Sequence, residues 1–333
     1  MKPCFIIAEA GVNHNGNMIL AKRLIDIAKR SGADAVKFKM FKAENEMILS
    51  APKAKYQETD EEESQYEMVK KLELSNDQFR ELTKYAKKVG IIFLASPFDY
   101  ESVDLLCELK VPYIKIASGE ITNYPFLEYV SSKKIPIIMS TGMATIEEVR
   151  TAIHIFHQSW AGATLLHCTS SYPTKPEDVN LKAMRVLRTT FDHPVGLSDH
   201  SLGITIPIAA VAMGACMIEK HFTIDKTFPG PDHKSSLSPF ELEQMVKAIR
   251  DVEKAMGDGI KRPTKDELET MKVVRRSIVS VKRIPKGTVI TEDMVAIKKP
   301  GTGIEPKFMD KVIGRKAKWH IDNDELISFE DIL

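Results

Sequence analysis

The chain has 333 residues, of which 43% are hydrophobic and 28% charged, and its formal net charge is +1. This composition is typical of a soluble globular protein large enough for two domains. The net charge near zero argues against a general electrostatic attraction to nucleic acid. The sequence also has no apolar run close to the roughly 20 residues that a membrane helix needs.

The N-terminal residues and the cysteines indicate a cytoplasmic protein. The stretch MKPCFIIAEAG meets Glu9 soon after a short apolar run, which is typical of a first strand rather than of a signal peptide. Cys4, Cys107, Cys168 and Cys216 show no CxxC spacing, so we expect reduced core residues rather than disulfides or a metal site.

Short apolar runs alternate with helical patterns through the first three quarters of the chain. The runs predict strands over 4–10, 34–39, 91–96, 112–118, 136–141, 164–169, 194–199 and 216–222. Helical spacing predicts helices over 18–32, 75–90, 145–159 and 238–256, with Ser75 and Ser238 as N-caps. A strand–helix repeat of eight units is typical of an α/β protein with a (β/α)8 TIM barrel. A doubly wound parallel sheet is the alternative.

The C-terminal part has a different character. Residues 257–276 are charged and contain two glycines and a proline, which predicts a linker between a barrel over 1–256 and a small domain over 277–333. The small domain is dense in Val, Ile, Lys, Gly and Pro, as short strands and tight turns are. A core of about 60 residues is marginally stable, so we expect this domain to pack against a barrel, either its own or a partner's.

Polar side chains end all eight predicted strands, which is where a TIM barrel carries its active site. They are Glu9, Lys37, Lys39, Ser96, Lys115, Ser118, Glu120, Ser140, His167, Tyr172, Ser198, His200, Glu219 and His221. Any one of them could be a hydrogen-bonded residue at a strand end. Together they predict a polar ring that binds ions or transfers protons.

The lysines of this ring point toward the barrel interior. Lys37 and Lys39 alternate with apolar residues along one strand, and Lys115 does so along another. A buried ammonium group is costly unless an anion neutralises it. With the neighbouring serines, the lysines favour a bound phosphate and carboxylate, and salt bridges to Glu9 or Glu120 are the alternative.

Two histidines end consecutive strands. In VGLSDHS, Ser198 and His200 share one face of the chain, and His221 ends the next strand about 5 Å away. Imidazole suits divalent transition metals, and two histidines leave positions open for water and substrate. The sequence therefore predicts a catalytic metal site, with a hydrogen-bonded histidine pair as the alternative.

A series of motifs resembles the sialic acid synthase family. In chain order they are IIAEAGVNHNG, APKAKYQ, ESQYEMVKKLEL, YIKIASGEITNYP, STGMAT, LLHCTSSYPT, VGLSDHS, IEKHFT and PGPDHKSSL. The tail IPKGTVITEDMVAIKKPGTGI resembles that family's C-terminal antifreeze-like (SAF) domain. The resemblance covers essentially the whole chain. It implies condensation of phosphoenolpyruvate with an N-acetylated amino sugar, which releases phosphate and a nine-carbon acid.

The resemblance also implies individual roles. Phosphoenolpyruvate would be held by Lys37, Ser96, Lys115, Ser118, Ser140, Ser170 and Ser198, and the sugar by Glu9, Tyr172, Asp232 and Lys299. His200 and His221 would bind Mn²⁺ or Mg²⁺. Glu9, Lys115 and Glu120 would form the catalytic group, in which Glu120 positions or deprotonates the attacking water.

Lys299 departs from the family pattern. Many relatives carry an arginine there, which reaches from the small domain into the partner's barrel and touches the sugar's N-acetyl group. The resemblance therefore implies a domain-swapped homodimer. A lysine holds an amide oxygen with less geometric definition than an arginine, and we expect Lys299 to take over the contact with weaker selectivity.

Three other questions concern the exact activity. The motifs APKAKYQ and GPDHKSSL resemble N-acetylneuraminate and legionaminate synthases more than pseudaminate synthases. Of the first two, we expect an N-acetylneuraminate synthase acting on N-acetylmannosamine, with a legionaminate synthase as the alternative. A Schiff-base aldolase with Lys115 as nucleophile is a more distant alternative, against which the paired histidines argue. The antifreeze-like tail alone would suggest a non-enzymatic carbohydrate-binding protein, which the polar ring disfavours.

Overall fold

The computed structural model describes residues 3–54, 57, 64–157 and 162–333. The chain forms two compact units, Met1–Gly257 and Asp258–Leu333. The last two positions of the helix predicted over 145–159 lie outside the described residues, as do parts of the motifs APKAKYQ and ESQYEMVKKLEL.

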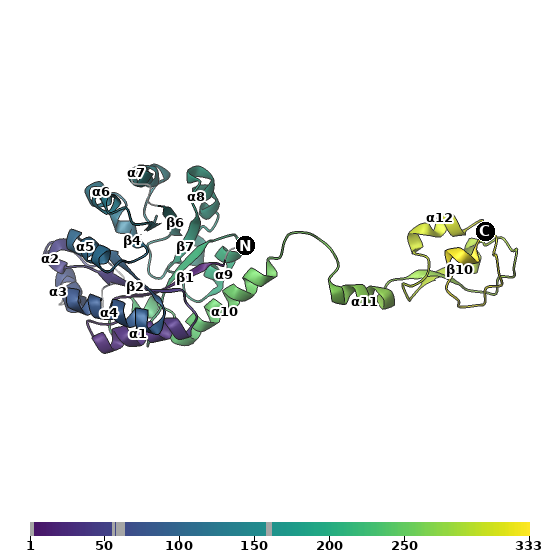
Figure 1. Ribbon diagram of the computed structural model, residues 1–333, viewed down its shortest axis with the longest axis horizontal. Helices are drawn as coiled ribbons and strands as arrows, with labels where there is room; N and C mark the ends of the chain where they lie inside the picture. Colours follow the sequence, from purple (N-terminus) through teal and green to yellow (C-terminus); the bar gives the residue numbers. More distant parts are fainter. Residues whose placement is uncertain (1–2, 55–56, 58–63, 158–161) are drawn as a thin grey trace. The chain divides into compact units, whose positions relative to one another are not determined.

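The first unit is a barrel of eight parallel strands (Figure 1). The strands are β1 (Phe5–Gly11), β2 (Ala35–Met40), β3 (Ile92–Pro97), β4 (Ile114–Ile116), β5 (Ile137–Ser140), β6 (Ala163–Cys168), β7 (Val195–Asp199) and β8 (Met217–His221). β1 pairs with both β2 and β8, and β3 and β4 lie side by side where the barrel closes. The predicted TIM barrel is therefore confirmed, and the doubly wound sheet is wrong.

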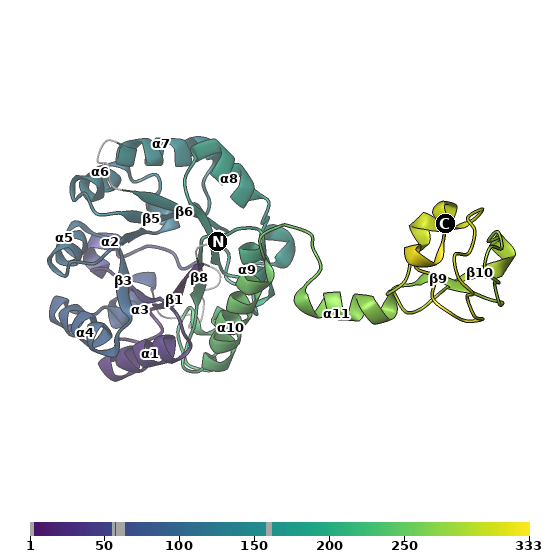
Figure 2. The ribbon, with the colours of Figure 1, turned by 45° about the vertical axis from the view of Figure 1, so that its right-hand side comes forward.

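Helices surround the barrel (Figure 2). They are α1 (Met18–Arg30), α2 (Ala43–Glu46), α3 (Gln65–Leu72), α4 (Asn76–Val89), α5 (Tyr100–Glu108), α6 (Tyr124–Ser132), α7 (Ile146–His157), α8 (Ala183–Phe191), α9 (Thr205–Ala212) and α10 (Pro239–Ala255). Ser75 and Ser238 are N-caps, as predicted. The hydroxyl of each accepts a hydrogen bond from the backbone N–H three residues on, within a complete capping box.

The barrel interior changes from apolar to polar along the strands. Its apolar layer consists of Ile7, Ala35, Leu94, Ile138, Leu166 and Met217. Two residues further along most strands, the inward side chains are charged or hydroxylic, because alternate residues share a face. Gly196 lies where β7 approaches β8 closely: a Cβ there would lie 2.3 Å from the backbone oxygen of Met217. The apolar layer closes the barrel beneath the polar residues.

A buried ion pair joins β7 and β8 on the outward-facing residues of these strands. The Nζ of Lys220 lies 2.5 Å from Oδ2 of Asp199, and both side chains are 1% exposed. Ser201 donates its backbone N–H and its hydroxyl to the same carboxylate, at 3.0 Å each. The pair immediately precedes His200 and His221, so it fixes the two strand ends that carry the histidines.

The second unit has its own small core. Its elements are α11 (Lys265–Val274), β9 (Ser277–Ser280), β10 (Val295–Lys298) and α12 (Met309–Val312). β9 and β10 pair antiparallel, and the core includes Ile278, Ile284, Ile304 and Ile327. The segment predicted as a linker thus contains a helix, α11, whose N-cap Thr264 forms a capping box with Glu267.

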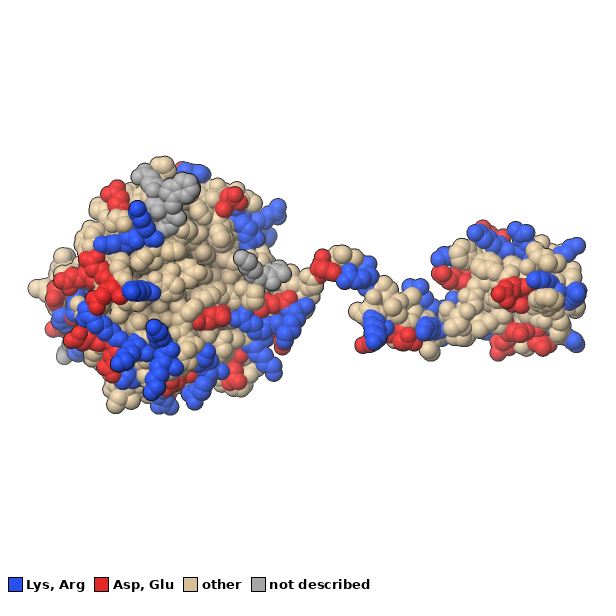
Figure 3. Space-filling model, in the orientation of Figure 1, with Lys and Arg blue, Asp and Glu red and all other residues tan. Residues whose placement is uncertain are grey.

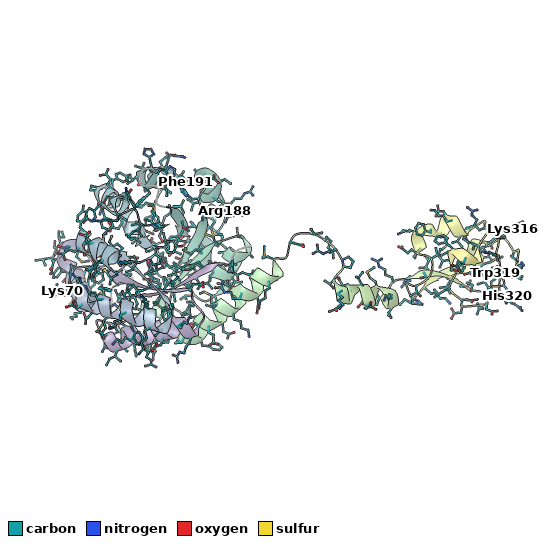
Figure 4. All side chains as sticks on the ribbon, viewed as in Figure 1. Lys70, Arg188, Phe191, Lys316, Trp319 and His320 are labelled. Atoms are coloured by element: carbon teal, nitrogen blue, oxygen red, sulfur yellow. The ribbon has the colours of Figure 1, made fainter. Side chains whose placement is uncertain are left out.

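The surfaces of both units carry mixed charges. On the face shown in Figure 3, Lys and Arg are interspersed with Asp and Glu. Trp319 of the second unit (labelled in Figure 4) is about half exposed. The Nζ of Lys318 lies 4.9 Å from the centroid of its ring. Within the described residues, no helix is both long and apolar enough to span a membrane. The four cysteines are unpaired, and Cys4 and Cys168 are buried.

Candidate active site

A cavity of about 410 Å³ opens at the C-terminal ends of the barrel strands, and its size suits a small-molecule site. Most of the residues predicted for the site line this single cavity. They are Glu9, Lys37, Ser96, Lys115, Ser118, Ser140, Ser170, Tyr172, Ser198, His200, His221 and Asp232. Helix α3 and Gln57 supply part of the wall away from the strands.

Lys37 is buried between two carboxylates at the base of the cavity. Its Nζ lies 2.9 Å from Oε2 of Glu9 and 3.4 Å from Oε1 of Glu219, and it donates to Ser96 Oγ at 3.0 Å. Burial lowers the pKa of an ammonium group, but Glu219 and Glu9 outweigh it and raise the pKa of Lys37. The alternative of a salt bridge to Glu9 is therefore observed, and Lys37 stays charged.

Lys115 shares one of these carboxylates. Its Nζ donates to Ser140 Oγ at 2.7 Å and to the Ile116 carbonyl at 3.1 Å, and it lies 3.6 Å from Oε1 of Glu219. Ser198 donates to the same oxygen at 3.1 Å. Burial raises the pKa of a carboxyl group, but Lys115 and Lys37 lower the pKa of Glu219 to about 2. Glu219 therefore links the two lysines as an anion.

A wall of small hydroxyl and thiol groups lies beside Lys115. The backbone N–H of Gly142 donates to Ser118 Oγ at 3.0 Å. A Cβ on Gly142 would lie 2.2 Å from Ser170 Oγ and 2.8 Å from Ser118 Oγ, so a larger residue would displace both hydroxyls. The thiol of Cys168 lies 3.6 Å from Ser118 Oγ. Such hydroxyls and a backbone N–H are suitable donors to an oxyanion.

The two histidines lie together at the cavity mouth, as the sequence predicts. Their ring centroids are 5.5 Å apart, and the ring of Tyr172 lies 4.1 Å from that of His200. Nδ1 of His200 is 2.9 Å from the Thr169 carbonyl oxygen, so Nε2 would be its coordinating atom. Burial lowers the pKa of His221 to about 3, which keeps this imidazole neutral.

These residues fit a divalent metal. Among the described residues, Nδ1 of His221 is buried without a hydrogen-bond partner, and Oε1 of Glu9 is in the same state. Glu9, Asp232 and His221 all lie close to Gly11: a Cβ there would lie 3.2 Å from Glu9 Oε1 and 3.3 Å from both Asp232 Oδ2 and His221 Cε1. The described part of the chain holds no group of three or more His, Cys, Asp or Glu arranged as a metal cage. The protein would thus supply two imidazoles and leave other positions open.

Asp232 lies between His221 and Lys39. Its Oδ2 lies 2.9 Å from Nζ of Lys39 and 3.7 Å from Nδ1 of His221. Burial raises the pKa of a carboxyl group, but Lys39 and His221 outweigh it and lower the pKa of Asp232 to about 2. The mouth of the cavity therefore carries a fixed carboxylate that can accept hydrogen bonds from a ligand.

Three predicted residues stand apart from the lining of this cavity. His167 of the predicted polar ring is not among the lining residues, and its Nε2 lies 2.6 Å from the Val179 carbonyl oxygen. Glu120 lies at the end of a 3-10 turn, Ser118–Glu120, where it is half-buried and accepts a hydrogen bond from Asn123 at 2.7 Å. The preceding residues Ser118 and Gly119 line the cavity, but Glu120 does not. Lys299 belongs to the second unit, where it is exposed after β10. Their roles stay predictions.

Other residues line the cavity, although the sequence analysis gave them no role in binding a substrate or metal. Lys39 and Glu219 belong to the predicted polar ring, and their strand-end positions were the available signal. Cys168 also ends a strand and faces inward, but its residue type suggested a core position. Gln57 and Gln65 come from the segment between β2 and α4, whose sequence carries no pattern that places it over the barrel.

A nearly closed (β/α)8 barrel with a polar cavity at the C-terminal ends of its strands defines a TIM-barrel enzyme. Residues 24–261 match the model of the NeuB family, and residues 275–333 match that of the SAF domain. The chain belongs to the NeuB family.

Three similar proteins cover nearly the whole chain or most of it. An N,N'-diacetyllegionaminic acid synthase of Campylobacter jejuni subsp. jejuni serotype O:2 is 50% identical, over 98% of this chain and 99% of its own. The N-acetylneuraminate-9-phosphate synthase of Homo sapiens is 39% identical, over 98% and 92%. The crystal structure of an N-acetylneuraminic acid (sialic acid) synthetase from Leptospira borgpetersenii, in complex with citrate, has a TM-score of 0.72 and 38% identity over 81% of this chain and 90% of that one.

Proposed function

We propose that this enzyme condenses phosphoenolpyruvate with an open-chain 2,4-diacetamido-2,4,6-trideoxy hexose, giving a legionaminate-type nine-carbon acid and phosphate. The choice of acceptor revises the expectation of N-acetylmannosamine. It is supported by the similarity to the legionaminic acid synthase, which exceeds the similarity to the two N-acetylneuraminate-type relatives. N-acetylmannosamine stays the second candidate acceptor.

The observation that carries the reaction class is the pairing of two buried lysines with a wall of serines inside one cavity. Lys37 and Lys115 supply two positive charges at its base, and Ser118, Ser140 and Ser170 add hydroxyl donors. This donor set suits a ligand with both a phosphate and a carboxylate group. Phosphoenolpyruvate carries both, and it would hold its reactive carbons between the lysines and the histidines.

The charges at the cavity also support an uncharged acceptor. At the cavity mouth, Nζ of Lys39 has a carboxylate oxygen of Asp232 at 2.9 Å, so its charge is already compensated before an acceptor binds. A phosphorylated sugar, of the kind implied by the name of the human relative, would bring further negative charge toward Glu9 and Asp232. Repulsion between the sugar phosphate and these carboxylates would disfavour binding.

The residues can be assigned to the steps of the condensation. The methylene carbon of phosphoenolpyruvate attacks the aldehyde carbon of the sugar, and positive charge develops at the carbon that bears the phosphate. Water adds to that carbon, and the resulting tetrahedral species loses phosphate by carbon–oxygen cleavage. Glu120 would take the proton from the water, since burial raises the pKa of its carboxyl toward the working pH.

The other groups bind and orient the reactants. Tyr172, Asp232 and Glu9 would hold the sugar hydroxyls, and the two lysines would hold the anion so that the encounter becomes intramolecular. His200 and His221 would bind Mn²⁺ or Mg²⁺, which supplies Lewis-acid polarisation of an aldehyde oxygen when it is present. Lys299 of a partner subunit would reach the N-acetyl group if the homodimer is domain-swapped.

The proposal is tested by phosphate release from phosphoenolpyruvate in the presence of Mn²⁺ and one of three acceptors. These are the diacetamido-trideoxy hexose, N-acetylmannosamine and its 6-phosphate. We expect kcat/KM to be highest for the first and lowest for the phosphorylated sugar. A preference for the 6-phosphate would contradict the charge argument, and release without any acceptor would contradict the reaction class.

A further inference from the structure

Lys115 is the less well neutralised of the two buried lysines. Lys37 has two carboxylates within ion-pair distance, Glu9 and Glu219. Among the described residues, the ion pair recorded for Lys115 is with Glu219 alone, at 3.6 Å, and Lys37 shares that same oxygen. The charge on Lys115 therefore depends on one shared carboxylate.

The surroundings of Lys115 otherwise favour a neutral amine. Burial is the largest influence and lowers the pKa of Lys115, and the neighbouring charge of Lys37 lowers it further. Glu219 on β8 opposes this shift, with smaller contributions from Cys168 on β6 and Glu9 on β1, and the pKa of Lys115 remains below its usual value. Removing the charge of Glu219 would therefore leave a lysine of the kind that Schiff-base enzymes use as a nucleophile.

A neutral amine at this position would meet a reactive partner. The product of the proposed reaction is a 2-keto acid, and its keto carbon is the former phosphate-bearing carbon, which would lie beside Lys115. The amine nitrogen would attack that carbonyl carbon, and the carbonyl oxygen would leave as water to give an imine. Such an imine would hold the product in the cavity and block turnover.

We propose that Glu219 guards against this side reaction by holding Lys115 as an ammonium ion, which has no lone pair for attack on a keto acid. The inference rests on the proposed function, since that function places a 2-keto acid in the cavity. It assigns a role to a carboxylate that makes no step of the condensation. It also implies that the barrel carries a latent imine-forming activity, which a single substitution would expose.

The test is reductive trapping with pyruvate as the keto acid. Pyruvate and sodium borohydride are added to the full-length chain at neutral pH, and the secondary amine formed from a reduced imine is located by peptide mass mapping. Glu219→Gln removes the charge but keeps an oxygen that can accept from Ser198, and Glu219→Asp keeps the charge. We expect Glu219→Gln to raise labelling of Lys115 at least about tenfold over wild type, the equivalent of one pKa unit. Glu219→Asp should stay near the wild-type level.

Two controls keep the result interpretable. The double variant Glu219→Gln, Lys115→Arg should lose the label, which identifies the nucleophile. If Glu219→Gln does not fold, as judged by circular dichroism, wild-type labelling is followed against pH, and we expect it to appear at Lys115 only above neutral pH. Wild-type labelling at neutral pH equal to that of the variant would overturn the proposal, as would a folded variant without label on Lys115.

The experiments distinguish failure of the role proposed for Glu219 from failure of the proposed function. Trapping uses pyruvate alone, without phosphoenolpyruvate, sugar or metal, whereas the function is measured by phosphate release from the wild-type chain. An unlabelled Glu219→Gln variant together with normal wild-type phosphate release would overturn the role of Glu219 only.

Discussion

Replacing Asp199 with asparagine should destabilise the barrel strongly, although the residue faces away from the cavity. The substitution leaves the ammonium of Lys220, which is 1% exposed, without its anionic partner at 2.5 Å. Breaking a buried ion pair in this way costs about 3–5 kcal/mol, because an uncompensated charge remains buried. The hydrogen bonds that Ser201 donates to the carboxylate are weakened at the same time.

The opposite substitution should cost less. Lys220→Met leaves the carboxylate of Asp199, which still accepts two hydrogen bonds from Ser201. The methionine side chain also fills a volume similar to that of the lysine. In the double variant Asp199→Asn, Lys220→Met no charge of the pair remains buried, and such replacements often change the free energy of unfolding little. We therefore expect Asp199→Asn to be the most destabilising of the three, with a coupling energy between the two sites of at least about 2 kcal/mol.

Urea unfolding of the four proteins, followed by far-ultraviolet circular dichroism, gives these free energies. Manganese titration of each folded variant shows whether the histidine pair is displaced, and we expect weaker binding by Asp199→Asn because His200 follows directly in the chain. A cost below about 1 kcal/mol for Asp199→Asn, or a coupling energy near zero, would refute the reasoning from buried charge.

Three further substitutions test the site by steady-state kinetics. Glu120→Gln should lower kcat at least about a hundredfold with little change in the KM of either substrate. In the wild type, kcat should fall at low pH because protonation of Glu120 removes the base, and the substitution should remove this acidic limb of the pH profile. An unchanged limb would exclude Glu120 as the base. Lys39→Met should raise the sugar KM but not that of phosphoenolpyruvate, because Lys39 holds Asp232; equal effects on both would contradict this. Lys299→Ala should likewise raise only the sugar KM, and Lys299→Arg should sharpen selection for N-acetylated sugars.

Much of the barrel and its interior could be predicted from short-range patterns. Alternation along a strand fixes which residues face inward, so Ser198 and His200 follow from VGLSDHS without knowledge of the pairing. Consecutive strands of a parallel barrel are neighbours, which places His221 beside His200. These local rules account for the agreement between the predicted ring and the cavity.

The differences arise where long-range folding or a turn decides the position. Lys39 and Asp232 are 193 positions apart, and their contact depends on how the loop after β8 folds back over the barrel. Glu120 is taken out of the inward alternation by the 3-10 turn that follows β4. Helix α11 was not predicted because the neighbouring Gly and Pro residues favoured a linker. The spacing of Thr264 and Glu267 is nevertheless that of a capping box, which indicates the start of a helix.

The most direct test of the proposed chemistry follows the bridging oxygen of phosphoenolpyruvate. Substrate labelled with ¹⁸O between carbon and phosphorus is converted with Mn²⁺ and the diacetamido-trideoxy hexose, and both products are analysed by mass spectrometry. We expect one labelled phosphate for each nine-carbon acid formed, because the carbon–oxygen bond breaks. Unlabelled phosphate with the label retained in the acid, or phosphate formed without the acid, would contradict it.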